Sequence, residues 1–262
     1  MKLDLAGKHA LVCGASRGIG RAAAEALAGL GADVTVLARN RDALDALART
    51  LPKIHGAQRH GWLAADVADT GALRSAVEAM VAAHPVQILI NNTGGPNPGP
   101  AIDASGDQFV DTFRRHLLAC HALVQATIGG MRSAGYGRIV NVISTSVKEP
   151  IRNLGVSNTI RGAVANWAKT LATELAPEAI TVNNVLPGFT RTQRLEQIIE
   201  DRVASTGKSR DQIESAMLAS VPAARFAEAA EVAAAIAFLA SPAASYITGI
   251  NLPVDGGRTQ SL

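Results

Sequence analysis

The chain has 262 residues, of which 48% are hydrophobic, 18% charged and 3% aromatic, and its formal net charge is +3. This length and apolar content allow one large α/β domain with a sizeable core and argue against disorder. Lys and Arg outnumber Asp and Glu only by 25 to 22, and there is no basic tail. We therefore expect no nucleic-acid partner.

Two cysteines, Cys13 and Cys120, are too few for a disulfide scaffold or a metal cluster, and we expect both to be reduced and packed. The first 13 residues carry Lys2, Asp4 and Lys8 and lack the apolar core of a signal peptide. No apolar run reaches the roughly 18 residues of a membrane span. These features predict a cytoplasmic protein with no metal and no membrane partner.

Short apolar runs alternate with amphipathic stretches along the chain, with no linker between them. Strands are predicted over 9–13, 33–38, 62–65, 86–90, 137–143, 179–186 and 248–254. Helices are predicted over 18–30, 42–49, 70–83, 105–133, 157–176 and 228–240. This alternation predicts one α/β domain over 1–262, a doubly wound parallel sheet with helices on both faces. Pro253 suits an edge position for the last strand.

A charged, partly helical insertion at 190–222 interrupts this alternation. It is interpreted as a substrate lid or as a surface excursion, and the sequence leaves both open.

A glycine-rich turn follows the first strand, where residues 13–20 read Cys-Gly-Ala-Ser-Arg-Gly-Ile-Gly. Glycines allow a tight turn and close approach of the backbone, and the helix after the turn offers free N–H groups to a pyrophosphate. A strand, such a turn and a helix together are typical of a dinucleotide-binding site.

Further motifs end the later strands: Asp66-Val67, Asn92-Thr93-Gly94, Asn141-Val-Ile-Ser144 and Pro187-Gly188, followed by Val254-Asp-Gly-Gly257 near the end. In order and spacing the chain resembles the short-chain dehydrogenase/reductase family over essentially its whole length. The likeness is strongest to the branch that contains 3-oxoacyl-(acyl-carrier-protein) reductases.

The resemblance implies a seven-stranded Rossmann-type domain, an NAD(P) cofactor, a small-molecule substrate and a homo-oligomer, dimer or tetramer. The cofactor-binding positions that it implies are Gly14, Ser16, Arg17, Gly18, Ile19, Asp66, Val67, Asn92, Thr93, Gly94, Pro187, Gly188, Thr190 and Thr192. Cys13 stands where the family usually has Thr, which removes a hydroxyl donor from the loop.

The predicted cofactor is NADP(H) rather than NAD(H). The second strand ends Leu37-Ala38-Arg39-Asn40, without the carboxylate that would accept a bond from the 2′-hydroxyl of NAD. Arg39 and Arg17 could instead bind a 2′-phosphate by charge-assisted hydrogen bonds.

The catalytic positions depart from the family pattern, which has Ser, Tyr, Lys and Asn. Ser144 occupies the Ser position, but Ser157 and Arg161 occupy the Tyr and Lys positions, and His116 aligns with the Asn. An aliphatic hydroxyl is a much weaker acid than a phenol, and Arg stays protonated and cannot relay protons. Arg161 could still bind ribose hydroxyls of the cofactor.

Three interpretations of the site remain open. Hydride transfer to or from a carbonyl or alcohol could persist with another acid, such as His116, whose ordinary pKa lies near 6.5. The reaction could instead reduce a conjugated C=C bond and need no strong oxygen acid. The chain could also bind NADP(H) without turnover, as a sensor or partner subunit. Arg152 and Arg161 make an anionic substrate conceivable, and the Gly- and Pro-rich segment 91–100 would shape the mouth of the pocket.

Overall fold

The strands assemble into one parallel sheet in the computed structural model, which describes residues 1–261. Within that range the sheet has seven strands in the order β3-β2-β1-β4-β5-β6-β7. The strands are β1 (His9–Cys13), β2 (Asp33–Ala38), β3 (His60–Ala64), β4 (Ile88–Asn92), β5 (Gly137–Val142), β6 (Ile180–Pro187) and β7 (Asn251–Val254). The predicted doubly wound sheet is confirmed, and β7 with Pro253 is an edge strand.

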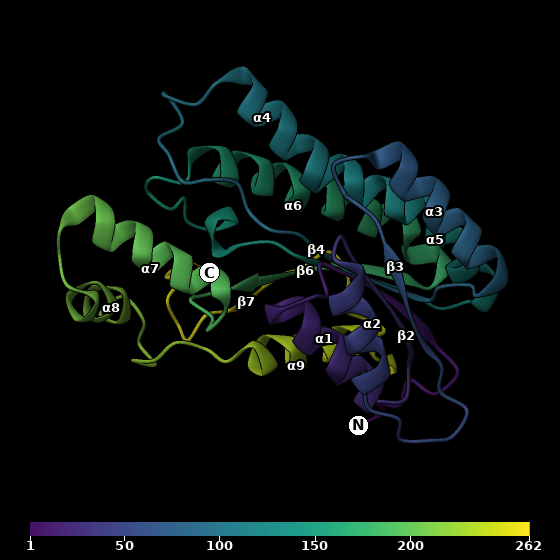
Figure 1. Cartoon of the computed structure of the whole chain (residues 1–262). Coiled ribbons are helices and arrows are strands. Elements are labelled where there is room, and N and C mark those ends of the chain that lie inside the picture. The colour runs from purple at the N-terminus through teal and green to yellow at the C-terminus, as the bar shows by residue number, and fades with distance from the viewer. Residues whose placement is uncertain (262) are drawn as a thin grey trace.

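Helices cover both faces of the sheet (Figure 1). They are α1 (Gly18–Gly29), α2 (Arg41–Thr50), α3 (Thr70–Ala83), α4 (Gly106–Phe113), α5 (Ala119–Ala134), α6 (Gly155–Leu175), α7 (Gln193–Thr206), α8 (Arg210–Leu218) and α9 (Ala229–Ala240). One apolar cluster joins α1, α2 and α9 to one face, and a second joins α3, α5 and α6 to the other. The central strands are therefore buried on both sides, as their nearly continuous apolar sequences require.

The single helix predicted over 105–133 is wrong in one respect. A π-helical turn at Arg114–Leu118 separates α4 from α5. The extra residue of a π-turn leaves no mark in the apolar periodicity, but it changes the direction of the side chains that it carries. His116 lies in this turn and is 4% exposed.

A row of asparagine side chains crosses the second half of the sheet. The strand register pairs Asn91 with Asn141, Asn141 with Asn184, and Asn184 with Asn251. Each side-chain amide in this row donates to the next side-chain oxygen, at 2.8, 2.9 and 2.8 Å. The row pairs polar groups that burial would otherwise penalise, apart from Asn91 Oδ1, which is buried without a partner. It also links β4 to β7 in register.

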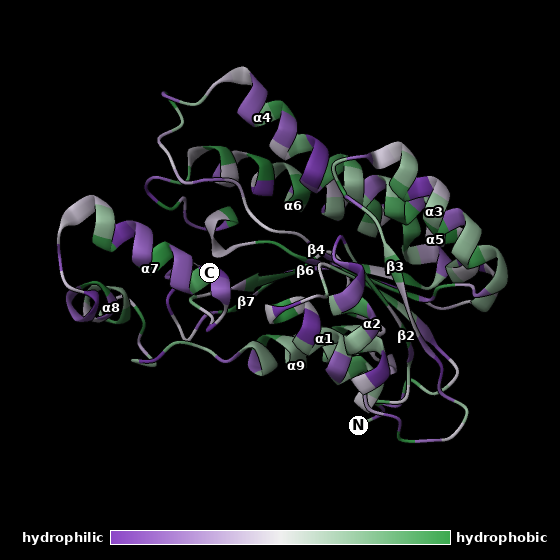
Figure 2. Ribbon diagram, in the orientation of Figure 1, coloured by the Kyte–Doolittle hydropathy of each residue, from purple (hydrophilic) through white to green (hydrophobic). Residues whose placement is uncertain are grey.

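The segment 190–222 leaves the sheet as α7 and α8, which pack on each other around their own apolar cluster with Phe226. Figure 1 shows both helices projecting to one side of the sheet, and Figure 2 shows hydrophilic residues along much of α7.

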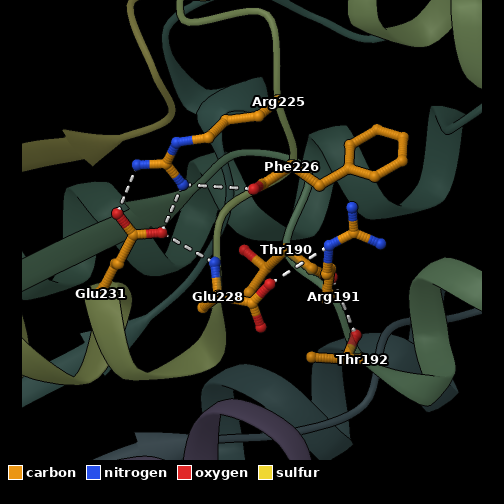
Figure 3. Close-up of polar contacts among 7 residues, drawn as sticks. All are labelled: Thr190, Arg191, Thr192, Arg225, Phe226, Glu228 and Glu231. Carbon is orange, nitrogen blue, oxygen red and sulfur yellow. Dashed lines mark hydrogen bonds and ion pairs between the residues drawn. The ribbon is translucent and has the colours of Figure 1, made fainter.

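The two ends of this insertion are held together. Thr190 forms a bridge with Ala227. On the C-terminal side of this junction, the Arg225 guanidinium makes a two-pronged ion pair with Glu231, with both bonds at 2.6 Å (Figure 3). Arg191 pairs with Glu228 at 3.2 Å across the same junction. The Arg225 bonds lower the pKa of Glu231 to about 2, so this pair persists through the neutral range.

Candidate functional site

The sequence motifs meet at one edge of the sheet, where the carboxyl ends of the parallel strands lie. Gly14 follows β1, Thr93 follows β4, Ser144 follows β5 and Gly188 follows β6. The strand order reverses between β1 and β4, and in open α/β sheets ligands bind in the crevice at such a point.

The glycine turn is packed so closely that side chains do not fit in it. A Cβ on Gly14, at φ +60°, would lie 2.5 Å from the Asn92 carbonyl oxygen, and a Cβ on Gly20 would lie 2.3 Å from the Gly14 carbonyl oxygen. Gly18 also has a positive φ, and Thr192 lies beside it. The turn therefore leaves backbone atoms uncovered by side chains at the start of α1.

The N-terminus of α1 has no side chain to satisfy its free N–H groups. Arg17 at the N-cap makes no capping bond and the first turn holds no acidic residue, whereas Asn40 and Asp69 cap α2 and α3. A helix N-terminus left open beside a glycine turn fits a pyrophosphate group. The residues present therefore fit a dinucleotide.

Asn92 lies under the glycine turn, where its side-chain amide donates to the carbonyls of Cys13 and Gly14 at 3.4 and 3.3 Å. Its visible role is to hold the turn against β4. Gly94 is exposed beyond it.

The two arginines expected at a 2′-phosphate are both exposed. Ala15 N–H donates to the Leu37 carbonyl at 3.2 Å, so the glycine turn lies beside the end of β2, which Arg39 follows. The guanidinium of Arg17 donates to the side-chain oxygen of Gln193 on α7.

The other expected cofactor positions line the same edge. The Asp66 carboxylate is exposed and accepts from Ala68 N–H at 2.9 Å, and Val67 packs against the apolar cluster under α3 and α5. Thr190 is buried and donates to the Gly188 carbonyl at 3.2 Å, while Thr192 caps α7. Ser16, Ile19 and Pro187 are all half-buried at the same edge.

Ser144 and Ser157 lie on the two elements that bound the crevice next to β5. The Ser144 hydroxyl accepts from Ser146 N–H at 3.1 Å directly after β5. Ser157 is half-buried in the first turn of α6, one helical turn before Arg161. The segment 91–100 closes on this end of α6, because Gly155 N–H donates to the Gly99 carbonyl at 2.9 Å.

Arg161 is a buried cation without a carboxylate partner in the part of the chain that the structure describes. It is 8% exposed, and Nη1 donates to the Val142 carbonyl at 2.9 Å. Nη2 lies beside Gly95, and Nε is buried without a partner. Burial lowers the pKa of Arg161 to about 10, which still leaves it charged at pH 7.

His116 lies between this arginine and the loop after β4. Its Nδ1 is 2.7 Å from the Thr93 hydroxyl. Burial, with the charges of Arg161 and Arg115, lowers the pKa of His116 to about 3, against a bond with the Gly94 backbone that raises it. The expected pKa near 6.5 is therefore wrong for His116 in the folded chain, because local sequence does not reveal this burial. The ring is neutral at pH 7.

Neither tyrosine reaches this edge of the sheet. The Tyr136 hydroxyl donates to the Ala240 carbonyl at 2.6 Å, at the start of β5, and Tyr246 is fully exposed. Cys13 and Cys120 are buried free thiols, as expected. Burial raises the pKa of the Cys120 thiol to about 12, against the nearby Arg161 charge that lowers it. Within residues 1–261 there is no cluster of His, Cys, Asp or Glu that could hold a metal.

Two arginines near this edge were not predicted from the sequence as site residues. Arg258, from the segment after β7, donates to the Thr145 hydroxyl at 3.3 Å, and Arg194 on α7 donates to the Pro96 carbonyl at 2.9 Å. The only signal for Arg194 was its place in the insertion at 190–222. None of the helices in the described range could cross a membrane.

Comparison with known proteins agrees with this geometry. A family model described as enoyl-(acyl carrier protein) reductase matches residues 14–259. The chain is 34% identical over 258 residues to a 3-oxoacyl-[acyl-carrier-protein] reductase of Vibrio harveyi, covering 97% of this chain and 98% of that one. It is 31% identical over 258 residues to the NADPH-dependent reductase BacG of Bacillus subtilis, covering 97% and 99%.

Among solved structures, L-sorbose reductase from Gluconobacter frateurii, in a complex with NADPH and L-sorbose, is similar over 100% of both chains with a TM-score of 0.93 and 30% identity. The fold, the order of the motifs and the sequence identity over nearly the whole chain all indicate the same family. The chain therefore belongs to the short-chain dehydrogenase/reductase family of oxidoreductases.

Proposed function

We propose that the chain is an NADP(H)-dependent oxidoreductase that acts on a carbonyl, an alcohol or a conjugated C=C bond without a tyrosine acid. The observation that carries the proposal is Arg161, a buried cation with no carboxylate partner in the described range, at the same edge of the sheet as an open dinucleotide cradle. The Bacillus relative is an NADPH-dependent reductase, and NADPH is bound in the sorbose reductase structure. Both support the choice of cofactor.

The motifs at the edge of the sheet would hold the cofactor in sequence order. The glycine turn (Gly14, Ser16, Arg17, Gly18 and Ile19) would bind the pyrophosphate, with Asp66 and Val67 at the adenine. Asn92, Thr93, Gly94 and Arg161 would lie along the nicotinamide ribose. Pro187, Gly188, Thr190 and Thr192 would lie at the nicotinamide ring. When bound, the cofactor supplies or accepts a hydride.

Arg161 would stabilise the negative charge that develops on the substrate oxygen. A fixed cation in a water-poor site is worth far more than the same charge in bulk water. Because its pKa stays near 10, Arg161 holds this charge and does not give up a proton at pH 7. The proton would come from water, to oxygen after carbonyl reduction or to carbon after reduction of a conjugated C=C bond.

Ser144 and Ser157 would orient the substrate oxygen by donating hydrogen bonds from the loop after β5 and from α6. His116 would act as a neutral positioning residue, because its imidazole stays uncharged and bonded to Thr93. This role replaces the acid role that a pKa near 6.5 would have allowed.

The insertion would act as a lid over this crevice. Gln193 contacts Arg17 at the glycine turn, and Arg194 bonds the Pro96 carbonyl on the loop after β4. The start of α7 thus touches both sides of the crevice, and the ion pairs at the base of the insertion would limit its movement to α7 and α8.

The proposed activity is tested by NADPH oxidation with a ketone (cyclohexanone), an enone (2-cyclohexenone) and a crotonyl thioester. Turnover of at least one is expected, with kcat roughly 100-fold or more lower in Ser144→Ala. Ser245→Ala, which removes an exposed hydroxyl elsewhere, should match the parent protein.

NADPH binding without turnover of any compound would favour a cofactor-binding sensor or partner subunit. Failure to bind NADPH would contradict both functions.

Arg39 sets the choice between the two nicotinamide cofactors. Arg39→Asp should lower the NADPH/NADH affinity ratio by about 10-fold or more, because it exchanges a 2′-phosphate partner for an acceptor of the 2′-hydroxyl. Fluorescence titration with each cofactor measures the ratio. Arg41→Asp, an equal charge change two residues later at the start of α2, should alter it much less. An unchanged ratio in Arg39→Asp would remove this residue from the cofactor site.

A further inference from the structure

A cavity of about 280 Å³ opens beside the loop that follows Ser144, and three segments far apart in the sequence line it. Thr145 and Arg152 come from the loop after β5, Arg202 comes from α7, and Arg258 comes from the segment after β7. The cavity therefore joins the candidate catalytic loop, the insertion and the C-terminal segment.

The charge of this cavity is strongly unbalanced. Among the described residues that line it, three arginines stand against a single carboxylate, that of Glu149. Glu149 Oε1 is already occupied, because it accepts from the backbone N–H groups of Gln260 and Ser261 at 2.6 and 2.8 Å. Within residues 1–261, no ion pair joins Arg152, Arg202 or Arg258 to a carboxylate. The three guanidinium groups of the cavity are therefore not neutralised by an ion pair within this range.

Arg258 is held in place with part of its bonding capacity unused. Its guanidinium stacks on Phe189, 4.6 Å from the ring centre, and Nη1 donates to the Thr145 hydroxyl at 3.3 Å. Its Nε is buried and has no partner. A fixed planar guanidinium with free donors, next to two more of the same charge, matches the geometry of an oxyanion.

We propose that this cavity binds an oxyanion of the substrate, a carboxylate or a phosphate, and so makes the substrate an anionic carbonyl or enone compound. The inference rests on the proposed function, because it names the substrate class of that site. Thr145 directly follows Ser144, so an anion held by Arg258 would place the reacting carbon a few bonds away at the Ser144 hydroxyl. Arg202 extends from α7, so the bound anion would also draw the insertion toward the catalytic loop.

The test compares the anion with its neutral analogue. Initial rates with NADPH are measured for 4-oxopentanoate, its methyl ester and dihydroxyacetone phosphate, at low ionic strength. The variants are Arg152→Gln and Arg202→Gln, both at exposed positions, and Lys208→Gln is the matched control, with the same charge change outside the cavity. We expect the KM for the preferred anion to rise about 10-fold in each cavity variant, with kcat within about threefold. The ester KM and the Lys208→Gln values should not change.

Equilibrium binding separates this inference from the proposed function. Calorimetric titration of the NADPH-saturated protein with succinate, and separately with inorganic phosphate, should give binding of one of them that weakens about 10-fold in Arg202→Gln. Such binding without turnover of any compound would uphold the anion site and overturn the proposed activity. Turnover with the same KM for acid and ester, or anion binding that is equal in all variants, would overturn the anion site. No binding of either anion and no turnover of the charged compounds would also overturn it.

Discussion

Gly20→Ala should weaken NADPH binding by about 10- to 100-fold, while Gly29→Ala in the same helix should leave it unchanged. A Cβ on Gly20 would lie 2.3 Å from the Gly14 carbonyl oxygen, so the backbone of the glycine turn must move. Such overpacking typically costs about 1–3 kcal/mol, and the displaced backbone is the part that would hold the pyrophosphate. A Cβ on Gly29, the last residue of α1, meets nothing within 4 Å.

Fluorescence titration with NADPH and urea unfolding of both variants measure this difference. Gly29→Ala should keep its affinity and gain up to about 1 kcal/mol of unfolding free energy, since alanine is the better helix former. An affinity in Gly20→Ala equal to that of the parent protein would show that the turn is not the phosphate cradle.

The fold was predictable because local patterns and tertiary structure agree. Strands β1 and β2 have the predicted limits, since buried parallel strands give continuous apolar runs bounded by Gly and polar residues. β4 begins at Ile88 rather than at residue 86. The first two residues of the predicted strand, which follow Pro85, lie before the paired part of the strand. A pattern of apolar residues does not show which of its members pair with the next strand.

The site was predictable in position but not in chemistry. Each motif ends a parallel strand, so topology alone brings Gly14, Thr93 and Ser144 to one edge. The protonation state of His116 depends on the burial of its ring in a π-helical turn and on the neighbouring Arg161 charge. Neither of these follows from local sequence. The three cavity arginines come from separate segments, and only the folded chain brings them together.

Arg161→Met should lower turnover by at least about 100-fold without destabilising the chain. Removal of a single fixed donor to a developing oxyanion typically costs this much in rate. Stability should respond differently, because the folded chain disfavours the charge. The pKa of Arg161 falls from an ordinary 12.5 to about 10, a penalty of about 3 kcal/mol, which offsets the loss of one hydrogen bond to Val142, worth about 1–2 kcal/mol. The unfolding free energy should stay equal or rise by up to about 2 kcal/mol.

Arg138 is the matched control, because it is also a buried arginine but lies at the start of β5, whereas Arg161 on α6 bonds the Val142 carbonyl at the end of that strand. Its guanidinium stacks on Tyr136 at 4.1 Å and donates to the carbonyls of Gly137, Ala179 and Ser241 at 2.8, 3.3 and 3.4 Å. Arg138→Met should therefore lose about 2–4 kcal/mol of unfolding free energy and keep its kcat, the reverse of the result for Arg161→Met. Urea unfolding and NADPH-oxidation rates of the two variants give both values. A loss of more than about 2 kcal/mol in Arg161→Met, with turnover intact, would make Arg161 a structural residue and leave the negative charge of the reaction without its proposed partner.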